Sequence, residues 1–160
     1  MSLGESDTLA YRVVQILRAN DQTVTCAESL TGGLIAATII DVPGASNVIK
    51  QSYITYCDEA KAQILRIPLA EIKENLAVSD YTAREMADHV RMLGCSSYGL
   101  SATGVAGPDT EDGQDVGTVF IGCASKDSVT VREYHFEGTR REIREQTVCA
   151  ALNLLLECVY

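Results

Sequence analysis

The sequence predicts an α/β protein, a three-layer α/β/α sandwich with a mixed β-sheet, folded as a single domain over residues 1–160. Segments with helical apolar spacing alternate with short runs typical of strands. The run Val119-Phe120-Ile121 is continuously apolar, which is typical of a strand buried on both faces. A chain of 160 residues with 46% hydrophobic side chains is long enough to bury one sizeable core.

The first third of the chain predicts two helices around a strand. Residues 6–20 form an amphipathic helix whose inner face carries Leu9, Val13, Ile16 and Leu17. A short strand follows over 23–27 and leads through a glycine-containing turn into a helix over 31–40.

The middle of the chain predicts a strand and two capped helices. Aromatic and β-branched residues alternate over 52–57 as in a strand, and we expect Asp58 to cap the helix that carries Lys61. Ser79 caps the next helix in the same way. The inner face of that helix comprises Ala83, Met86, Ala87 and Val90.

The last third predicts three strands and a helix. A strand of small residues over 98–103 precedes a loop over 104–115, and the strands 116–124 and 129–136 form a hairpin. Because the apolar parity changes along the second hairpin strand, we expect a bulge near Arg132. Thr139 and Glu142 form a capping box before the final helix. Its inward residues are Ile143, Val148, Leu152 and Leu155.

Composition narrows the function classes. With 22 acidic and 13 basic residues the formal net charge is -9, which disfavours binding to nucleic acid. No apolar stretch approaches the length of a membrane helix and no signal segment opens the chain, so we expect no membrane partner and a cytoplasmic location. The six scattered cysteines are expected to be reduced, and two isolated histidines, His89 and His135, predict no metal site.

One motif carries candidate chemistry, the run Ala27-Glu28-Ser29-Leu30-Thr31-Gly32-Gly33. It places the Ser29 hydroxyl where a strand turns into a helix, and the backbone N–H groups that follow could form an oxyanion hole. From this run alone, a plain helix cap at Ser29 or Thr31 with packing glycines is the better-supported interpretation.

A second motif, Tyr53 to Lys61, supplies a candidate base. Lys61 lies about one turn into a helix, where the positive end of the helix dipole favours its neutral form. A nearby Asp58 carboxylate would favour the charged form instead. An exposed surface lysine, and a packing role for Tyr56, are the alternatives.

These motifs together resemble the CinA carboxy-terminal domain family. The resemblance extends from the first helix to the last and includes the Gly44-Ala45-Ser46 turn, the loop Gly104 to Asp109 and the strand Val116-Gly117-Thr118-Val119. It implies a PncC-type nicotinamide-nucleotide amidohydrolase, which converts nicotinamide mononucleotide to nicotinate mononucleotide and ammonia without a cofactor. It also implies a small-molecule nucleotide as the partner and leaves a homo-oligomer open.

The resemblance assigns roles residue by residue. By this resemblance, Ser29 would be the nucleophile and Lys61 its general base. Tyr56 would supply a hydroxyl that relays or orients the proton. Backbone amides near Thr31, Gly32 and Gly33 would hold the oxyanion. The substrate would be bound by Gly104, Ala106, Gly107 and Arg140, with Arg144 as a second phosphate-binding candidate. Either arginine could equally be a solvent-facing charge paired with a neighbouring glutamate.

One segment departs from the family pattern. Many members have a glycine-rich stretch after Pro108-Asp109, where this chain has the acidic run Thr110-Glu111-Asp112-Gly113-Gln114-Asp115. This loop would repel an anionic nucleotide, so either it points away or the substrate differs. Two alternatives therefore stay open, an amidase that acts on a less anionic amide and a noncatalytic nucleotide-binding protein.

Overall fold

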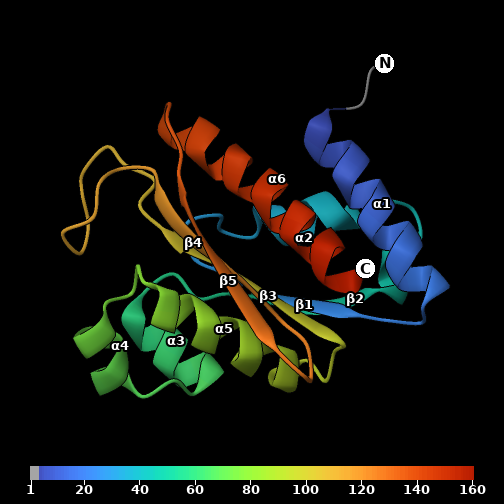
Figure 1. The fold of residues 1–160 in the computed structure, drawn as a ribbon, viewed down its shortest axis with the longest axis horizontal. Coiled ribbons are helices and arrows are strands. Elements are labelled where there is room, and N and C mark those ends of the chain that lie inside the picture. Colours follow the sequence, from blue (N-terminus) through green and yellow to red (C-terminus); the bar gives the residue numbers. More distant parts are fainter. Residues whose placement is uncertain (1–3) are drawn as a thin grey trace.

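A computed structural model describes residues 4–160, so the first three residues of the expected domain lie outside it. Five strands form one sheet in the order β2-β1-β3-β4-β5 (Figure 1). The strands are β1 (Val24–Glu28), β2 (Ile49–Ile54), β3 (Tyr98–Gly104), β4 (Thr118–Ala124) and β5 (Val129–His135). Strands β2, β1 and β3 run parallel, whereas β4 and β5 are antiparallel to their neighbours, so the predicted mixed sheet is confirmed.

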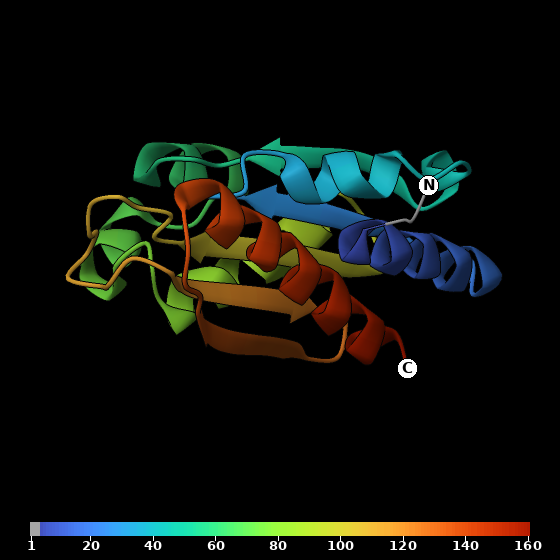
Figure 2. The ribbon, with the colours of Figure 1, turned by 90° about the horizontal axis from the view of Figure 1, so that it is seen from above.

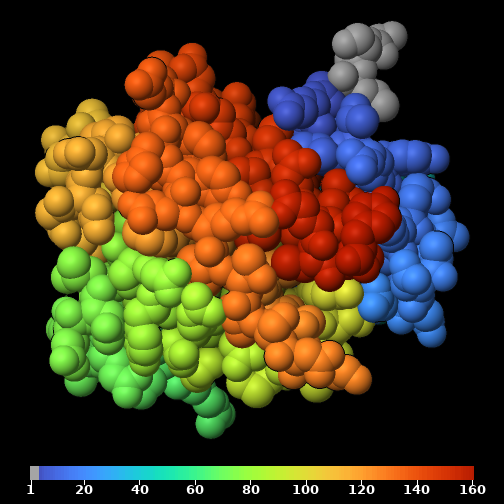
Figure 3. All heavy atoms as spheres, in the orientation of Figure 1, coloured from blue at the N-terminus to red at the C-terminus, as the bar shows by residue number. Residues whose placement is uncertain are grey.

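Helices cover both faces of the sheet, as predicted (Figures 1 and 2). One layer contains α1 (Glu5–Ala19), α2 (Leu34–Ile40) and α6 (Arg140–Val159). The other contains α3 (Asp58–Leu65), α4 (Leu69–Asn75) and α5 (Asp80–Leu93), and a short 3-10 helix η1 (Ala45–Asn47) precedes β2. Figure 3 shows the end of α6 in red next to the blue α1, with which α6 packs.

The core lies on both sides of the sheet because every residue of β1 and β4 is buried. The larger apolar cluster joins the sheet to α1, α2 and α6. A smaller one lies under α3, α4 and α5 and includes Leu65, Ile72, Met86 and Val90. Two packed faces hold the parallel strands in place, and their carboxyl ends meet at one edge of the sheet.

Two predicted helix starts are confirmed in detail. The Ser79 hydroxyl accepts a hydrogen bond of 3.1 Å from the Thr82 N–H at the start of α5. At the start of α6, Thr139 accepts from the Glu142 N–H at 3.2 Å and the Glu142 carboxylate accepts from the Thr139 N–H at 3.1 Å. These caps depend on residues three positions apart, which is why the sequence predicts them well.

Two predicted boundaries and one predicted helix cap were wrong. Helix α2 begins at Leu34 rather than at residue 31, because Gly32 and Gly33 have φ of 56° and 98°, outside the right-handed helix. Strand β2 covers Ile49–Ile54 rather than 52–57, since an edge strand tolerates its exposed polar residues. Asp58 is the first residue of α3, whose N-cap is Cys57, and it makes no capping bond.

The bulge expected near Arg132 is absent from β5, where the antiparallel pairing with β4 is regular from Val129 to His135. Both faces of this edge strand are partly covered. Val131 packs with Val78, Val105 and Phe120 on the α5 side, while Tyr134 contacts the cluster under α6. The change in apolar parity therefore reflects two covered faces. Helix α4 was not predicted.

Candidate active site

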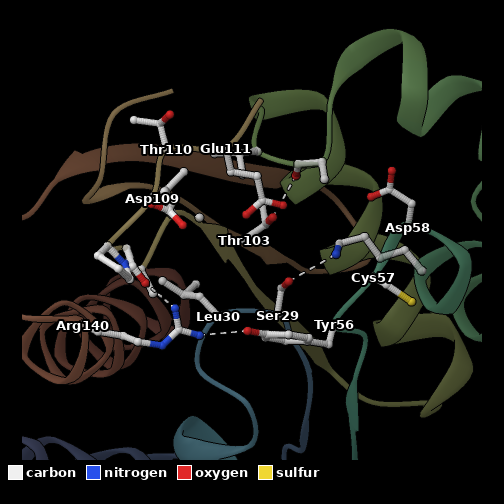
Figure 4. A pocket seen from close by; sticks show the side chains of 18 of the residues that line it. Ser29, Leu30, Tyr56, Cys57, Asp58, Thr103, Asp109, Thr110, Glu111 and Arg140 are labelled. Carbon is white, nitrogen blue, oxygen red and sulfur yellow. Dashed lines mark hydrogen bonds between the residues drawn. The ribbon is translucent and has the colours of Figure 1, made fainter. Parts of the chain in front are cut away.

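A cavity of about 630 Å³ opens where β1, β2 and β3 end (Figure 4). Crevices beyond the carboxyl ends of parallel strands are common ligand sites in α/β proteins. Seven of the sequence-predicted site residues line it: Ser29, Tyr56, Lys61, Gly104, Ala106, Gly107 and Arg140. Thr31, Gly32 and Gly33 are absent from its lining.

Ser29 and Lys61 meet inside this cavity. The Lys61 Nζ donates to the Ser29 Oγ at 3.2 Å, the dashed line drawn from Ser29 in Figure 4, and to the Thr55 carbonyl at 2.9 Å. Lys61 is only 1% exposed and Ser29 only 8% exposed. A fully buried lysine amine in contact with a hydroxyl is the arrangement that a Ser–Lys pair requires.

The environment of Lys61 shifts the pKa of its amine. Burial lowers the pKa of the Lys61 amine from its ordinary value, because desolvation penalises the charged state. The negative charges of Asp58, Glu111 and Asp112 act in the opposite direction and moderate this effect. The net lowering makes Lys61 a better general base than an exposed lysine would be.

The turn after Ser29 offers backbone donors. The Ser29 N–H is bonded to the Ala102 carbonyl at 3.0 Å and the Gly32 N–H to the Ser29 carbonyl at 3.1 Å. Among residues 4–160, the N–H groups of Leu30, Thr31 and Gly33 donate no hydrogen bond. Of these three residues only Leu30 lines the cavity, and Thr31 is fully buried, so the Leu30 N–H is the one available for an oxyanion there.

The two glycines of the motif serve the turn itself. A Cβ added to Gly32 would lie 3.4 Å from the Arg144 side chain, and one added to Gly33 would lie 3.3 Å from Ile54. Their positive φ values are the larger constraint, because side-chain-bearing residues rarely adopt them.

Arg144 lies outside the cavity lining and braces the same turn. Its Nε donates to the Leu30 carbonyl at 2.9 Å and a terminal nitrogen donates to the Thr31 carbonyl at 3.0 Å. Two of its five N–H donors are therefore engaged with the backbone, and unlike Arg140 it does not face the cavity.

Tyr56 and Arg140 form a pair at the edge of the cavity. The Tyr56 hydroxyl accepts a hydrogen bond from Arg140 at 2.9 Å, and Arg140 also donates to the Gly107 carbonyl. Tyr56 is 60% exposed, and its hydroxyl is bonded to Arg140 rather than to Ser29 or Lys61. The tyrosine O–H itself is left free to donate to a bound molecule.

The loop that follows β3 forms the opposite wall. Gly104 is required by packing, since a Cβ there would lie 2.7 Å from the Thr118 carbonyl oxygen. Figure 4 shows Asp109, Thr110 and Glu111 together on this wall, with Asp58 on another side of the cavity. The start of the acidic run, Thr110 and Glu111, therefore faces the cavity, whereas residues 112–115 lie outside its lining.

Sequence reasoning missed the role of Glu28. It is 0% exposed, and its two carboxylate oxygens accept hydrogen bonds from the Ile35 and Ala36 N–H groups at 2.8 and 3.0 Å. An acidic residue at the end of an otherwise apolar strand was the available signal, because such a charge is buried only where partners compensate it.

Among residues 4–160, no group of three or more His, Cys, Asp or Glu side chains is placed to hold a metal ion. None of the helices in the same range has the length and apolar character that a membrane span requires.

The comparisons with known proteins agree on one family. The family model of the CinA C-terminal domain matches residues 6–159. A protein of Streptococcus thermophilus that bears the name competence-damage inducible protein is 43% identical over 157 residues, which cover 98% of this chain and 37% of that protein. A relative with the same name from Lacticaseibacillus casei is 40% identical over 157 residues, covering 98% of this chain and 38% of its own length.

Solved structures are similar in fold as well. The competence/damage inducible protein CihA from Agrobacterium tumefaciens has a TM-score of 0.93 at 31% identity, with 98% of each chain covered. A CinA superfamily protein from Klebsiella pneumoniae has a TM-score of 0.93 at 28% identity, covering 96% of this chain and 97% of that one. The chain thus spans little more than a third of the first curated relatives but nearly all of these solved chains.

Proposed function

The chain belongs to the CinA C-terminal domain family, and on that premise we propose that it is an amidohydrolase that converts nicotinamide mononucleotide to nicotinate mononucleotide and ammonia. The observation that carries this proposal is the buried contact between the Lys61 Nζ and the Ser29 Oγ at 3.2 Å. It provides a nucleophile and a base in hydrogen-bond contact within a cavity large enough for a ligand.

The first step forms an acyl-enzyme. The Ser29 Oγ attacks the carboxamide carbon while its proton passes to the neutral Lys61 Nζ, and the carbonyl oxygen becomes an oxyanion. The Leu30 N–H group, on a residue that lines the cavity, is the donor available to stabilise that oxyanion. The protonated Lys61 then transfers a proton to the amide nitrogen, the C–N bond breaks and ammonia leaves.

The second step releases the acid. A water molecule loses a proton to the neutral Lys61 while the water oxygen attacks the ester carbon. The second oxyanion accepts a hydrogen bond from the same backbone N–H as the first. When the C–O bond to Ser29 breaks, Lys61 returns its proton to the Ser29 Oγ. The pair ends in its starting state, so the cycle consumes only water and the amide.

Tyr56 and Arg140 would orient the substrate at the edge of the cavity. The free Tyr56 O–H can donate to the ribose, the phosphate or the leaving nitrogen. Arg140 keeps donors beyond its bonds to Tyr56 and Gly107, and a guanidinium suits a phosphate. These assignments are part of the proposal.

The direct test is ammonia release from nicotinamide mononucleotide by the purified chain, with nicotinate mononucleotide measured in parallel. We expect the two products in equal amounts. Binding of the nucleotide without turnover would contradict the proposal and favour the noncatalytic alternative.

The acidic wall favours a second candidate, an amidase for a less anionic amide. Four carboxylates line the cavity, those of Asp58, Glu59, Asp109 and Glu111, against the guanidinium of Arg140 and the Lys61 amine, which is neutral in the proposed mechanism. This balance repels a phosphate more than an uncharged group. Comparing nicotinamide mononucleotide with the phosphate-free nicotinamide riboside decides between the two candidates. A kcat/KM at least tenfold higher for the riboside would favour the second.

A further inference from the structure

We propose that Glu28 is a positioning residue for this reaction: its buried carboxylate holds the turn that presents Ser29, so that its loss lowers kcat more than it changes KM. The inference rests on the proposed function. It concerns a side chain outside the lining of the cavity that acts through the Ser29 turn.

The carboxylate of Glu28 takes the place of a missing helix cap. The N-cap of α2 is Gly33, which has no side chain to offer, and no side-chain cap bond is made there. Glu28 instead accepts from the Ile35 and Ala36 N–H groups at 2.8 and 3.0 Å, seven and eight residues ahead in the chain. One residue thereby ties the end of β1 to the first turn of α2.

Burial makes the two hydrogen bonds of the Glu28 carboxylate costly to break. A carboxylate removed from water is costly unless its oxygens are bonded, and here each oxygen has a backbone donor. Losing either bond would leave a fully buried charge partly unsatisfied, so the turn between residues 28 and 35 has little freedom to shift.

The main chain of Glu28 is also connected to Lys61 through hydrogen bonds. The Glu28 carbonyl accepts from the Thr55 N–H at 2.8 Å, and the Thr55 carbonyl accepts from the Lys61 Nζ at 2.9 Å. Lys61 in turn contacts Ser29, the residue after Glu28, at 3.2 Å. These hydrogen bonds and the peptide bond between Glu28 and Ser29 therefore form a closed ring, in which Ser29 and Lys61 are both positioned through Glu28.

The variant Glu28→Gln tests this role because it keeps the size of the side chain. One amide position would present an NH₂ group to a backbone N–H, so one of the two bonds becomes a repulsive contact. We expect kcat to fall by about ten- to a hundredfold, since small misplacements of reacting groups have effects of this order. KM should stay within about twofold, and the pH midpoint of kcat should not move, because Lys61 keeps its burial.

Thr147→Val is the matched control. The Thr147 hydroxyl is fully buried and donates to the Ile143 carbonyl at 2.7 Å within α6, and Thr147 does not line the cavity. The substitution removes a buried hydrogen bond without touching the Ser29 turn. It should lower the melting temperature and leave kcat unchanged. An equal loss of kcat in both variants would mean that general destabilisation explains the effect, which overturns the proposal.

Other outcomes are equally decisive. A folded Glu28→Gln with kcat within twofold of the unmodified chain overturns the inference while the proposed function stands. If the unmodified chain releases no ammonia, the proposed function fails and the kinetic role of Glu28 fails with it.

If Glu28→Gln does not fold, hydrogen exchange on the unmodified chain tests whether the Glu28 carboxylate holds the Ile35 and Ala36 amides. The Ile35 and Ala36 amides should exchange at least a hundredfold more slowly than free amides, although they stand in the first turn of a helix. Unprotected amides at these two positions would remove the tie and overturn the proposal.

Discussion

Two segments that contribute residues to the cavity lining are held in place differently. The turn from Glu28 to Gly33 is bonded on one side by the Glu28 carboxylate and on the other by Arg144, through four bonds of 2.8 to 3.0 Å. The loop from Val105 to Asp115 is joined to β4 near its base, and farther along it receives bonds from Arg140 and from the Val78 N–H to Asp112. If the proposed function is right, we expect changes in the turn to affect turnover most and changes in the acidic loop to affect substrate preference.

The largest effect should come from the turn. Ser29→Ala removes the proposed nucleophile from a position that contributes little to packing, so turnover should fall by at least about a thousandfold while the fold is kept. Ammonia release and a thermal melt on the same sample check both statements. Turnover retained in this variant would exclude covalent catalysis by Ser29.

The next effect concerns Lys61. Lys61→Met keeps an apolar stem in a fully buried site, so it is a milder packing change than Lys61→Ala, and turnover should fall by about a hundred- to ten-thousandfold, the usual contribution of a general base. In the unmodified chain only the neutral amine accepts a proton, so activity should be lost as pH falls through the Lys61 pKa. Because burial lowers that pKa, the midpoint should lie below the ordinary lysine value of about 10.4.

A pH profile of kcat/KM without added metal provides that check. A midpoint near the histidine value of about 6.5 that disappears in a histidine variant would assign the base elsewhere.

A smaller effect is expected from the loop. Glu111→Gln removes a negative charge that raises the Lys61 pKa, so the midpoint of the pH profile should shift to lower pH. The same change should lower KM for nicotinamide mononucleotide a few-fold at low salt, because one repulsive charge is lost. Asp115→Asn is the control, since it makes the same charge change in the same loop but lies outside the cavity lining. Equal shifts in both variants would point to net charge alone.

The smallest effect is expected outside both segments. His89 contacts the Leu65 carbonyl at 2.7 Å and Glu85 at 3.1 Å, and His135 pairs with Glu133 at 3.0 Å. Neither histidine lines the cavity, so replacing each by Gln should leave turnover within about twofold, as should treatment with EDTA. Loss of turnover in a folded histidine variant would mean that Lys61 is the wrong base.

Sequence reasoning succeeded where partners are close in the chain. The caps at Ser79 and Thr139 follow from contacts over three residues, and the buried faces of α5 and α6 follow from helical periodicity. The alternation of helices and strands was enough to predict the three layers. It did not predict where β2 begins, because its exposed residues show no apolar alternation.

The site was only partly predictable because its contacts are tertiary. Ser29 and Lys61 were candidates from two motifs, and the resemblance assigned their roles. Their actual distance depends on how β1 and β2 pair. Nothing in local sequence shows that Arg144 bonds the Leu30 carbonyl, or that the Tyr56 hydroxyl bonds Arg140. Side chains that form hydrogen bonds with groups distant in the sequence cannot be identified from a single sequence.

The brace between Arg144 and the Ser29 turn also bears on when activity is acquired during folding. The hydrogen-bonded residues Arg144 and Leu30 are 114 positions apart in the sequence. Their contact therefore forms only once α6 has packed against the turn that follows β1. Contacts of such long sequence separation form slowly, because loop closure must precede them. In a refolding experiment, turnover should therefore return with the slowest phase, after helical circular dichroism has already recovered.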